Sequence, residues 1–289
     1  MLRKVRVAVV GVGAWGERQL RACAATSGMV VAAIADQRLS RLRTLRPDLP
    51  AFASAEQLFA TRIADAVIIA TPNASHAGLA ALALEAGLHV LVEKPLATTR
   101  AAAERVARLA RQHGLVAMVG HLLEHHPRVL ALEELVAAGQ LGALQRIESR
   151  RLAIRTTRDD PWWNLAPHDV SLAIRFAGSP RALRFVGERH GCERYELDHM
   201  SGITSRIEVG FGCPMKVREL RIVGSAAAAV FDDTAAPSRP SPLERQAAAF
   251  VAAIRSGAAE RSGATHGVEV VHWLEVGARV RERARRGAA

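Results

Sequence analysis

The sequence VRVAVVGVGAWG, residues 5–16, decides the fold of this chain. Its first six residues are apolar and mostly β-branched, which predicts a buried parallel strand. Three glycines follow at once: Gly11 permits a tight turn, Gly13 lets the backbone approach a phosphate, and Gly16 lets a helix pack close to the strand. Residues 17–25 have the pattern of that helix, whose first N–H groups would face an anion. The stretch therefore predicts a cradle for a pyrophosphate.

A carboxylate stands where a ribose-binding acid is expected. A second apolar run, residues 29–35, ends at Asp36, about 20 positions beyond the last glycine of the motif. A glycine-rich turn with an unrelated surface acid is the alternative. The order strand, turn, helix, strand and acid favours dinucleotide binding. We expect NAD, because Asp36 would repel a 2′-phosphate; NADP is the alternative, because Arg38 could offset that repulsion.

Composition sets further bounds. The 289 residues are enough for one large domain or two ordinary ones, and 49% hydrophobic with 23% charged residues is typical of a globular chain. Cys23, Cys192 and Cys213 are scattered, which favours a reducing compartment over a disulfide framework. The N-terminus has no signal-peptide pattern and no apolar run is long enough to span a bilayer, so we expect a cytoplasmic protein with no membrane partner.

The formal net charge of +11 raises the question of nucleic-acid binding. The basic residues form no long uninterrupted run, and the densest cluster, residues 279–286, has the pattern of a solvated helix face. We therefore expect no nucleic-acid partner.

Strands and helices alternate along the first part of the chain. This alternation predicts a doubly wound parallel sheet of the α/β class, with ligands at the carboxyl ends of its strands. The predicted strands are 5–10, 29–35, 64–70, 89–92 and 115–119, and the predicted helices are 17–25, 54–61, 76–86 and 98–113.

The pattern changes after Pro127. Longer strands with alternating polarity predict a second, α+β domain with an open, mostly antiparallel mixed sheet. The expected domains are residues 1–120 and 121–289, with the final helices able to pack back on the first domain. The predicted strands are 144–156, 182–186, 204–211, 217–223 and 227–231, and the predicted helices are 128–138, 167–176, 243–256 and 267–286.

Lys94 is the first candidate for proton transfer. It follows a predicted buried strand and lies between Glu93 and Pro95. A surface lysine whose ammonium reaches water is the alternative. At the carboxyl end of a strand in a dinucleotide-binding fold, a functional role is favoured.

The second candidate lies in the run WWNLAPHD, residues 162–169. Asn164 and His168 are four positions apart, so one face of a helix start can hold both. A histidine ring exchanges protons near neutral pH. Arg155 and Arg158, with the neighbouring arginines of the preceding strand, could bind an anionic group such as a nucleotide diphosphate; an exposed basic strand face is the alternative.

Four motifs in this order resemble one known family over nearly the full length of the chain. They are residues 11–16 with Trp15, TPN at 71–73 with His76, EKP at 93–95, and PHD at 167–169. Together they resemble the glucose–fructose oxidoreductase / inositol dehydrogenase (Gfo/Idh/MocA) family. Residues 120–127 and the WxxAPHD run resemble a bacterial subgroup that includes enzymes oxidising the 3-hydroxyl of UDP-N-acetylglucosamine-type sugars.

The resemblance implies a Rossmann domain, an open sheet through which homodimers or homotetramers form, and Lys94 and His168 as the acid–base groups. The family usually has Asp where this chain has Asn164, and an amide cannot take a proton, so the base stays open between Lys94 and His168. The subgroup tends to have Tyr where this chain has His125. The residues expected at the substrate are Asn164, Arg155, Arg158, Trp163 and His121. Those expected at the cofactor are Gly11, Val12, Gly13, Ala14, Trp15, Gly16, Asp36, Thr71, Pro72, Asn73, His76, Glu93 and Lys94.

The predicted function is an NAD(P)-dependent oxidoreductase that transfers hydride between a sugar and nicotinamide, and the resemblance to the subgroup implies the C3 position of a nucleotide sugar. The alternatives are a keto-sugar reductase that uses NADPH and a non-catalytic dinucleotide-binding sensor. Residues 121–125 also match H-x-x-E-H, a zinc-peptidase signature. That signature needs both histidines on one helix, whereas the next helix is expected to start at Pro127. We therefore expect no metal, and a structural or cleft role for His126.

Overall fold

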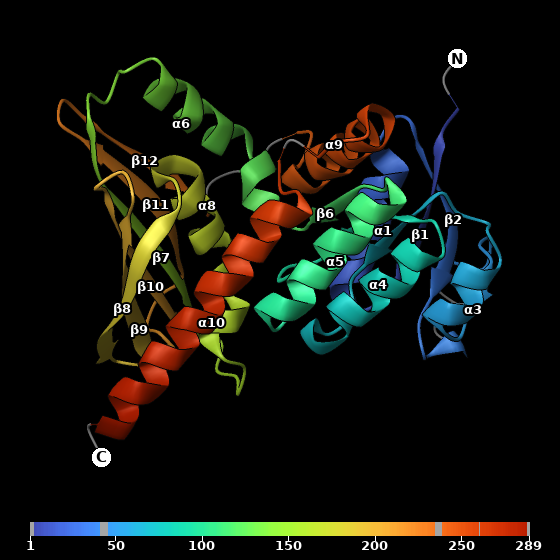
Figure 1. Ribbon diagram of the computed structural model, residues 1–289, viewed down its shortest axis with the longest axis horizontal. Helices are drawn as coiled ribbons and strands as arrows, with labels where there is room; N and C mark the ends of the chain where they lie inside the picture. The colour runs from blue at the N-terminus through green and yellow to red at the C-terminus, as the bar shows by residue number, and fades with distance from the viewer. Residues whose placement is uncertain (1–2, 41–45, 235–238, 260, 288–289) are drawn as a thin grey trace. The chain divides into compact units, whose positions relative to one another are not determined.

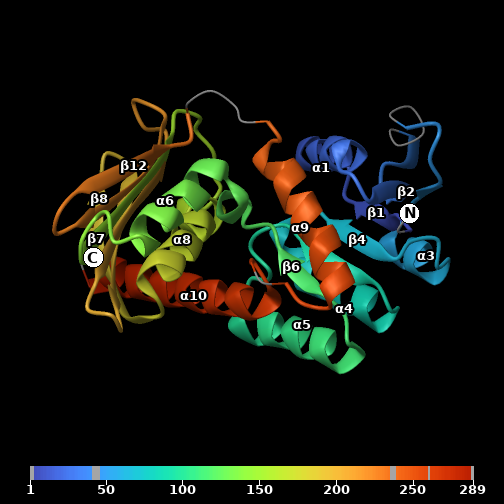
Figure 2. The same cartoon turned by 90° about the horizontal axis from the view of Figure 1, so that it is seen from above.

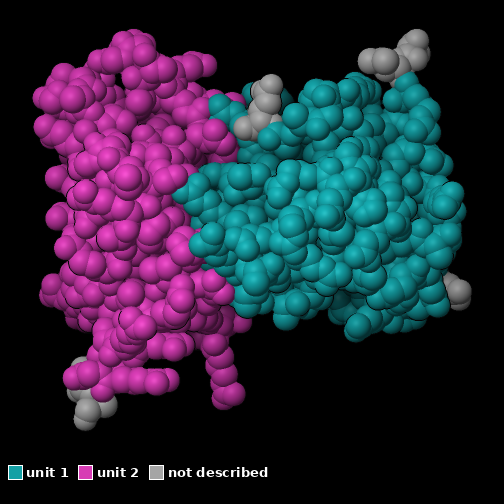
Figure 3. Space-filling view, viewed as in Figure 1, with its two compact units in different colours: residues 1–122, 240–271 teal, residues 123–239, 272–289 magenta. Residues whose placement is uncertain are grey.

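The computed structural model describes residues 3–40, 46–234, 239–259 and 261–287. The chain divides into two compact units (Figure 3): unit 1 is residues 1–122 with 240–271, and unit 2 is residues 123–239 with 272–289. Unit 1 therefore includes helix α9 (Pro242–Ser256) and the first turns of α10 (Ala264–Gly287). The predicted division into a dinucleotide-binding domain, residues 1–120, and a substrate-binding and oligomerisation domain, residues 121–289, stays a prediction.

Unit 1 contains a six-stranded sheet in the order β3-β2-β1-β4-β5-β6, and every pairing in it is parallel. Its strand order reverses at β1, with β2 on one side and β4 on the other, and such a switch point opens a crevice at the carboxyl ends. The predicted doubly wound sheet is confirmed. The short edge strand β3 was not predicted, because two residues carry no readable period. The strands are β1 (Val5–Val10), β2 (Met29–Ala35), β3 (Ala51–Phe52), β4 (Ala66–Ile69), β5 (His89–Val92) and β6 (Ala117–Val119).

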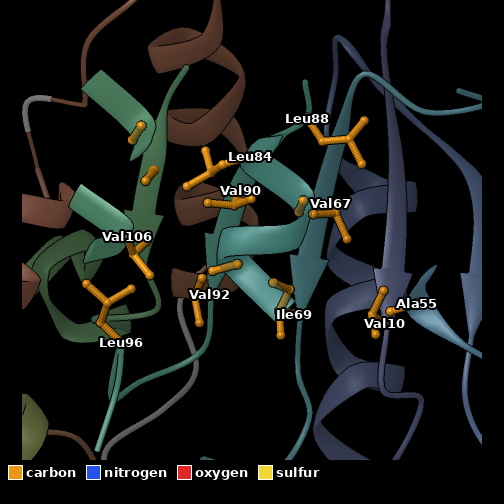
Figure 4. Close-up of a cluster of buried hydrophobic side chains, with 14 of the residues drawn as sticks. Val10, Ala55, Val67, Ile69, Leu84, Leu88, Val90, Val92, Leu96 and Val106 are labelled. Atoms are coloured by element: carbon orange, nitrogen blue, oxygen red, sulfur yellow. The ribbon is translucent and has the colours of Figure 1, made fainter. Parts of the chain in front are cut away.

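Helices cover both faces of this sheet (Figures 1 and 2): α1 and α9 lie on one face, and α3, α4 and α5 on the other. Both faces are buried, so β1, β4 and β5 are apolar almost throughout. Figure 4 shows the cluster between the strands and the second layer of helices. The helices are α1 (Ala14–Ala25), α3 (Ala55–Ala60), α4 (His76–Glu85) and α5 (Arg100–His113), with a 3₁₀ turn, η1, at Asn73–Ser75.

Unit 2 contains a second six-stranded sheet in the order β12-β11-β7-β10-β9-β8. Only the central pair, β7 with β10, is parallel; the other neighbours are antiparallel. The mostly antiparallel mixed sheet is thus confirmed. Its strands are β7 (Leu144–Ala153), β8 (Pro180–Arg189), β9 (Cys192–His199), β10 (Thr204–Phe211), β11 (Val217–Gly224) and β12 (Ala228–Asp232). Its helices are α6 (Pro127–Ala137), α7 (Pro161–Asn164) and α8 (Pro167–Ala177), preceded by a 3₁₀ turn, η2, at Leu122–His125.

Strand β9 was missed by the sequence analysis because two polar residues face its interior side. Glu193 accepts a hydrogen bond from Tyr195 Oη at 2.7 Å, and His199 Nε2 lies 2.8 Å from Ser205 Oγ. Both polar side chains are buried. A strand whose inward positions include a carboxylate and an imidazole lacks the apolar alternation by which strands are recognised.

The buried indole of Trp162 organises the packing of α10 within unit 2. The ring stacks on Tyr195 with centroids 3.8 Å apart, and its Nε1 donates to the Leu274 carbonyl at 2.8 Å. The α10 backbone passes so close that a Cβ on Gly277 would lie 2.4 Å from the ring. Glycine at this helical position is therefore a packing requirement. No helix in the described part of the chain is both long and apolar enough to cross a membrane.

Replacing Gly277 tests this packing. Gly277→Ala should lower the free energy of unfolding by about 1–3 kcal/mol, as overpacking does. Gly78→Ala is the matched control, since Gly78 is also helical but a Cβ there would meet no atom within 4 Å; it should be neutral or stabilising by up to about 1 kcal/mol. Urea unfolding of both variants measures the difference. Equal effects of the two substitutions would contradict the close approach.

Candidate functional site

The three glycines of the β1–α1 turn differ in their surroundings, as a phosphate-binding turn requires. Gly11 has φ +85°, and a Cβ there would lie 2.7 Å from the Ala70 carbonyl oxygen. A Cβ on Gly16 would lie 1.9 Å from the Gly11 oxygen, so the helix packs directly on the turn. A Cβ on Gly13, in contrast, would meet no atom within 4 Å. The open position lies at the N-cap of α1, where a dinucleotide pyrophosphate would be held.

Asp36 follows β2 and faces the same turn. Its Oδ2 accepts a hydrogen bond from the Val12 backbone N–H at 2.9 Å, and its Oδ1 accepts one from the Arg38 N–H at 3.0 Å. Partial burial works to raise the pKa of Asp36, but the hydrogen bonds from Arg38 and Val12 outweigh it and hold the pKa below its ordinary value. The side chain is therefore an anion at neutral pH. A carboxylate with remaining lone pairs at this place fits a ribose diol and opposes a 2′-phosphate.

The buried Glu93 carboxylate connects the end of β5 to α1. Its Oε1 accepts hydrogen bonds from Trp15 Nε1 and, at 2.6 Å, from Gln19 Nε2. A Cβ on Gly120 would lie 2.8 Å from Oε2, so the end of β6 packs against the same carboxyl group. Burial raises the pKa of Glu93, although the hydrogen bonds from Gln19 and Trp15, the charge of Lys94 and its backbone N–H lower it. One side chain thus contacts three segments of the carboxyl edge.

His76 joins the loops after β4 and β5. It is 1% exposed, with Nδ1 at 2.7 Å from the Pro95 carbonyl and Nε2 at 2.8 Å from the Thr71 carbonyl. Burial lowers its pKa, against the effect of the two carbonyls. The ring therefore fixes the loop that contains the half-buried Lys94. In the neighbouring TPN segment, which continues into η1, Ser75 Oγ donates to Thr71 Oγ1 at 2.7 Å.

In unit 2, Asn164 and His168 occupy successive helices. Asn164 is the last residue of α7, and His168 is the second residue of α8. The expectation that one helix face holds both is wrong, because Pro167 has no N–H to continue the α7 hydrogen-bond ladder and starts a new helix. Asn164 Nδ2 lies 3.5 Å from Asp159 Oδ2. His168 and Trp163 are partly buried.

Asp169, next to His168, anchors the first turn of α8 to the sheet. It is 1% exposed and accepts hydrogen bonds from Arg151 Nε at 2.9 Å and Nη2 at 3.1 Å, and one from Ser149 Oγ. Arg151 is itself buried. A paired, fully hydrogen-bonded buried charge of this kind has a defined position. It therefore fixes the backbone from which His168 projects.

The arginines near β7 separate into different environments. Arg150 pairs with Glu208 at 2.7 Å on the opposite face from Arg151. Arg155 is exposed, lies 3.7 Å from Asp159 and stacks over Phe211 at 4.7 Å from the ring centroid. Arg158 is exposed. Of the arginines the sequence grouped together, Arg151 is thus structural, while Arg155 and Arg158 are accessible.

The H-x-x-E-H residues have other partners. Glu124 is fully buried and accepts hydrogen bonds from Ser171 Oγ and, at 2.6 Å, from Arg175 Nη2. His121 packs edge-on against the ring of His266 with centroids 5.7 Å apart. His126 caps α6, which begins at Pro127 as predicted, by accepting from the Arg128 N–H. Among the described residues, no three His, Cys, Asp or Glu side chains gather as a metal site would require.

The structure brings the expected cofactor residues together within unit 1. The turn with Gly11, Gly13 and Gly16, the Asp36 carboxylate, and the loops with His76 and Glu93 all lie at strand ends of one sheet. Lys94 and His121 belong to unit 1, whereas Asn164, Trp163, His168, Arg155 and Arg158 belong to unit 2. Gln19 was not predicted; a polar residue one turn beyond Trp15 on the buried side of α1 is the signal that could have revealed it.

Two substitutions test the Glu93 contacts. Glu93→Ala should destabilise the fold by roughly 1–3 kcal/mol for each donor it leaves unsatisfied and weaken NAD binding. Glu93→Gln keeps an acceptor, and at pH 5 its free energy of unfolding should be close to that of wild type. Because burial raises the Glu93 pKa above 4.5, the ionised carboxyl group costs stability as the pH rises past that value. The stability of Glu93→Gln relative to wild type should therefore increase from pH 5 to pH 8 in urea unfolding; an unchanged difference would contradict the raised pKa.

Comparison with known proteins agrees with this geometry. Residues 5–121 match the model of the Gfo/Idh/MocA family, described as an oxidoreductase family with an NAD-binding Rossmann fold. A UDP-N-acetylglucosamine 3-dehydrogenase from Acidithiobacillus ferrooxidans is 33% identical over 189 residues, which are 63% of this chain and 58% of that protein. A dTDP-3,4-didehydro-2,6-dideoxy-alpha-D-glucose 3-reductase from Streptomyces violaceoruber is 34% identical over 151 residues, 51% of this chain and 44% of that protein. The matches thus span under two thirds of these relatives.

Solved structures extend the likeness to the whole chain. A UDP-N-acetylglucosamine 3-dehydrogenase from A. ferrooxidans superimposes with a TM-score of 0.84 at 25% identity, covering 95% of this chain and 96% of that one. A scyllo-inositol dehydrogenase from Lactobacillus casei, solved with NAD(H) and scyllo-inositol, gives a TM-score of 0.86 at 15% identity, covering 96% and 97%. The predicted nicotinamide dinucleotide cofactor agrees with the description of the family model and with the NAD(H) bound in that structure. Residues 5–121 therefore match the Gfo/Idh/MocA oxidoreductase family, and the chain has the fold of these two dehydrogenases.

Proposed function

We propose that this protein is a nicotinamide-dependent sugar oxidoreductase that transfers hydride between the C3 position of a nucleotide sugar and NAD. The observation that carries the proposal is the Glu93 carboxylate, which bonds to Trp15 and Gln19 of the phosphate-binding helix and is hydrogen-bonded by the Lys94 backbone. The same carboxyl group thereby holds the cofactor helix and the candidate acid–base lysine.

Each residue has a distinct proposed task. Nicotinamide, when bound, supplies the hydride acceptor or donor. Lys94 or His168 takes the hydroxyl proton during oxidation and returns it during reduction. The Asn164 amide orients a sugar hydroxyl but cannot take its proton. The sugar class is suggested by two relatives named for nucleotide sugars, a dehydrogenase and a reductase.

A reductase that uses NADPH is the second candidate, and one observation favours it. Arg38 Nε lies 3.4 Å from Asp36 Oδ1, so a guanidinium is present beside the ribose-binding acid. This cation could partly neutralise Asp36 and accept a 2′-phosphate. The sensor alternative is disfavoured because the chain has both Lys94 and His168.

We also propose assembly as a homodimer or homotetramer through the unit 2 sheet. Val186 of β8 and Val230 of β12 are 50% and 56% exposed, although both are large apolar residues in strands. Covering them would bury apolar surface. A cytoplasmic location is proposed as well, since all three cysteines are free thiols and buried.

Cofactor preference depends on the charge of Asp36. Wild type should bind NAD more tightly than NADP, because the carboxylate accepts ribose hydroxyls and repels the 2′-phosphate. Asp36→Ala should weaken NAD binding by about ten- to hundredfold, the loss expected for a charge-assisted hydrogen bond. The difference between the affinities for NAD and NADP should become smaller. Fluorescence titration with both reduced cofactors measures this. Tighter binding of NADP by wild type would reverse the assignment of Asp36 and favour the reductase.

Turnover tests the proton-transfer candidates. The substrate is first identified by a thermal-shift screen of nucleotide sugars with NAD. A ligand at a hundred times its Kd should raise the free energy of unfolding by about 2.7 kcal/mol. Lys94→Ala should then lower kcat by roughly 10²–10⁴-fold while leaving NAD affinity nearly unchanged. His168→Ala should do the same if His168 is the base, and mainly raise KM if it only holds the sugar.

The exposed Lys4 in the same unit provides the control. Lys4→Ala should behave as wild type in every assay. Full activity of both Lys94→Ala and His168→Ala would contradict the mechanism. Inactivity of wild type on every sugar, with NAD still bound, would favour the sensor.

A further inference from the structure

Two arginines stand opposite one another on the face of the unit 2 sheet that α8 covers. Arg218 of β11 is the antiparallel cross-strand partner of Arg151 of β7. The next pairs along the same face are Leu220 with Ser149 and Ile222 with Ile147. The leucine and both isoleucines pack in one buried cluster with Leu172 of α8, and Figures 1 and 2 show α8 beside this sheet. The face is therefore apolar at one end and has two guanidinium groups at the other.

Within the part of the chain that the structure describes, Arg151 has a counterion in contact and Arg218 does not. Arg151 is held by Asp169 through two hydrogen bonds, and its Nη1 lies 4.0 Å from Asp233. Arg218 is half-buried, and among the described residues no carboxylate lies within ion-pair distance of it. Burial and the positive charge of Arg151 lower the pKa of Arg218, and the opposing charges of Asp233 and Asp169 do not compensate.

Such an arrangement is unfavourable in the isolated protein. Like charges directly opposite in a sheet repel one another, and a half-buried cation without a contacting anion loses hydration without replacement. The next two inward positions of β11, Leu220 and Ile222, are apolar, so an aliphatic side chain at position 218 would suit the fold better than a second guanidinium beside Arg151. A bound anion would remove the cost, since Arg binds carboxylates and phosphates through its planar, forked donors.

The position of Arg218 relates it to the proposed chemistry. Asp169, the partner of Arg151, directly follows His168 in the first turn of α8. The charge of Arg155, an accessible residue beyond the end of β7, also acts on Arg218. A ligand anion at Arg218 would therefore lie at the end of the sheet to which Asp169 anchors the first turn of α8.

We propose that Arg218 binds the anionic group of the substrate at this end of unit 2, with Arg155 adding to the positive field. The shared chemistry is a phosphate or carboxylate oxygen, and a nucleotide diphosphate is the source that the proposed function favours. This inference rests on the proposed function for the identity of the substrate, but the anion site itself rests on the Arg151–Arg218 pair.

Calorimetric titration of the NAD-saturated protein tests the proposal, with UDP as the diphosphate probe and D-glucuronate as the carboxylate probe. Saturation with NAD keeps UDP out of the dinucleotide cradle. Arg218→Gln should weaken binding of UDP by about ten- to hundredfold, and Arg218→Lys should restore part of it. Arg221→Gln is the matched control, since Arg221 is exposed on the same strand, at an odd offset that places it on the other face; it should bind UDP as wild type does.

The remaining outcomes are distinct. If Arg218→Gln weakens binding of glucuronate but not of UDP, the result supports the site with a carboxylate as its ligand. Unchanged affinity of Arg218→Gln for both probes overturns the site, as does an equal loss in Arg221→Gln. The midpoint of thermal unfolding distinguishes a binding role from a structural one. Arg218→Gln should not lower this midpoint, because the proposal gives Arg218 a role in binding. If wild type turns over a nucleotide sugar and Arg218→Gln changes neither its kcat nor its KM, this site alone is contradicted. If UDP binds through Arg218 but no sugar is turned over, the proposed function alone is contradicted.

Discussion

The carboxyl edge of unit 1 depends on one buried carboxyl group. Glu93 accepts hydrogen bonds from the indole of Trp15 and the amide of Gln19, and Gly120 packs against its other oxygen. A buried carboxyl group without partners would be strongly destabilising, so these contacts must form together. Because they come from α1, β5 and β6, the glycine turn, the EKP loop and the last strand cannot move independently. The position of Lys94 follows from this constraint.

Unit 2 has a similar constraint around the pair of Asp169 and Arg151. The pair is almost inaccessible to water and fully hydrogen-bonded, which defines the start of α8 and the backbone of His168. On the neighbouring strand β11, Arg218 lies opposite Arg151 and has no contacting anion among the described residues. The two units thus use the same device, a buried carboxylate next to a candidate acid–base residue. In each, the carboxylate is hydrogen-bonded within the fold and stands next in sequence to the candidate residue, Lys94 or His168.

Much of this architecture was predictable because it follows from local patterns. The glycine spacing, the apolar strands and the acid after β2 each need only a few neighbouring residues to be recognised, and the structure has them where the sequence predicts. The buried partners were not predictable. Arg150 and Arg151 are adjacent and chemically identical, yet one pairs on the outer face and the other is buried, and only the register of β7 decides between them. Gln19 and the inward Glu193 were missed because polar residues normally indicate an exposed face. The catalytic roles of Lys94 and His168 stay predictions.

The central claim is that hydride passes between a sugar carbon and nicotinamide. Isotope transfer tests it most directly: wild type is incubated with NAD and a UDP-N-acetyl sugar that has deuterium on C3, and the reduced cofactor is analysed by mass spectrometry. The account predicts one deuterium in each reduced cofactor and an equal amount of 3-keto sugar. Reduced cofactor without deuterium would place the oxidation elsewhere on the sugar, and the absence of any reduced cofactor, with nucleotide sugars of every base tested, would contradict the assignment as a dehydrogenase.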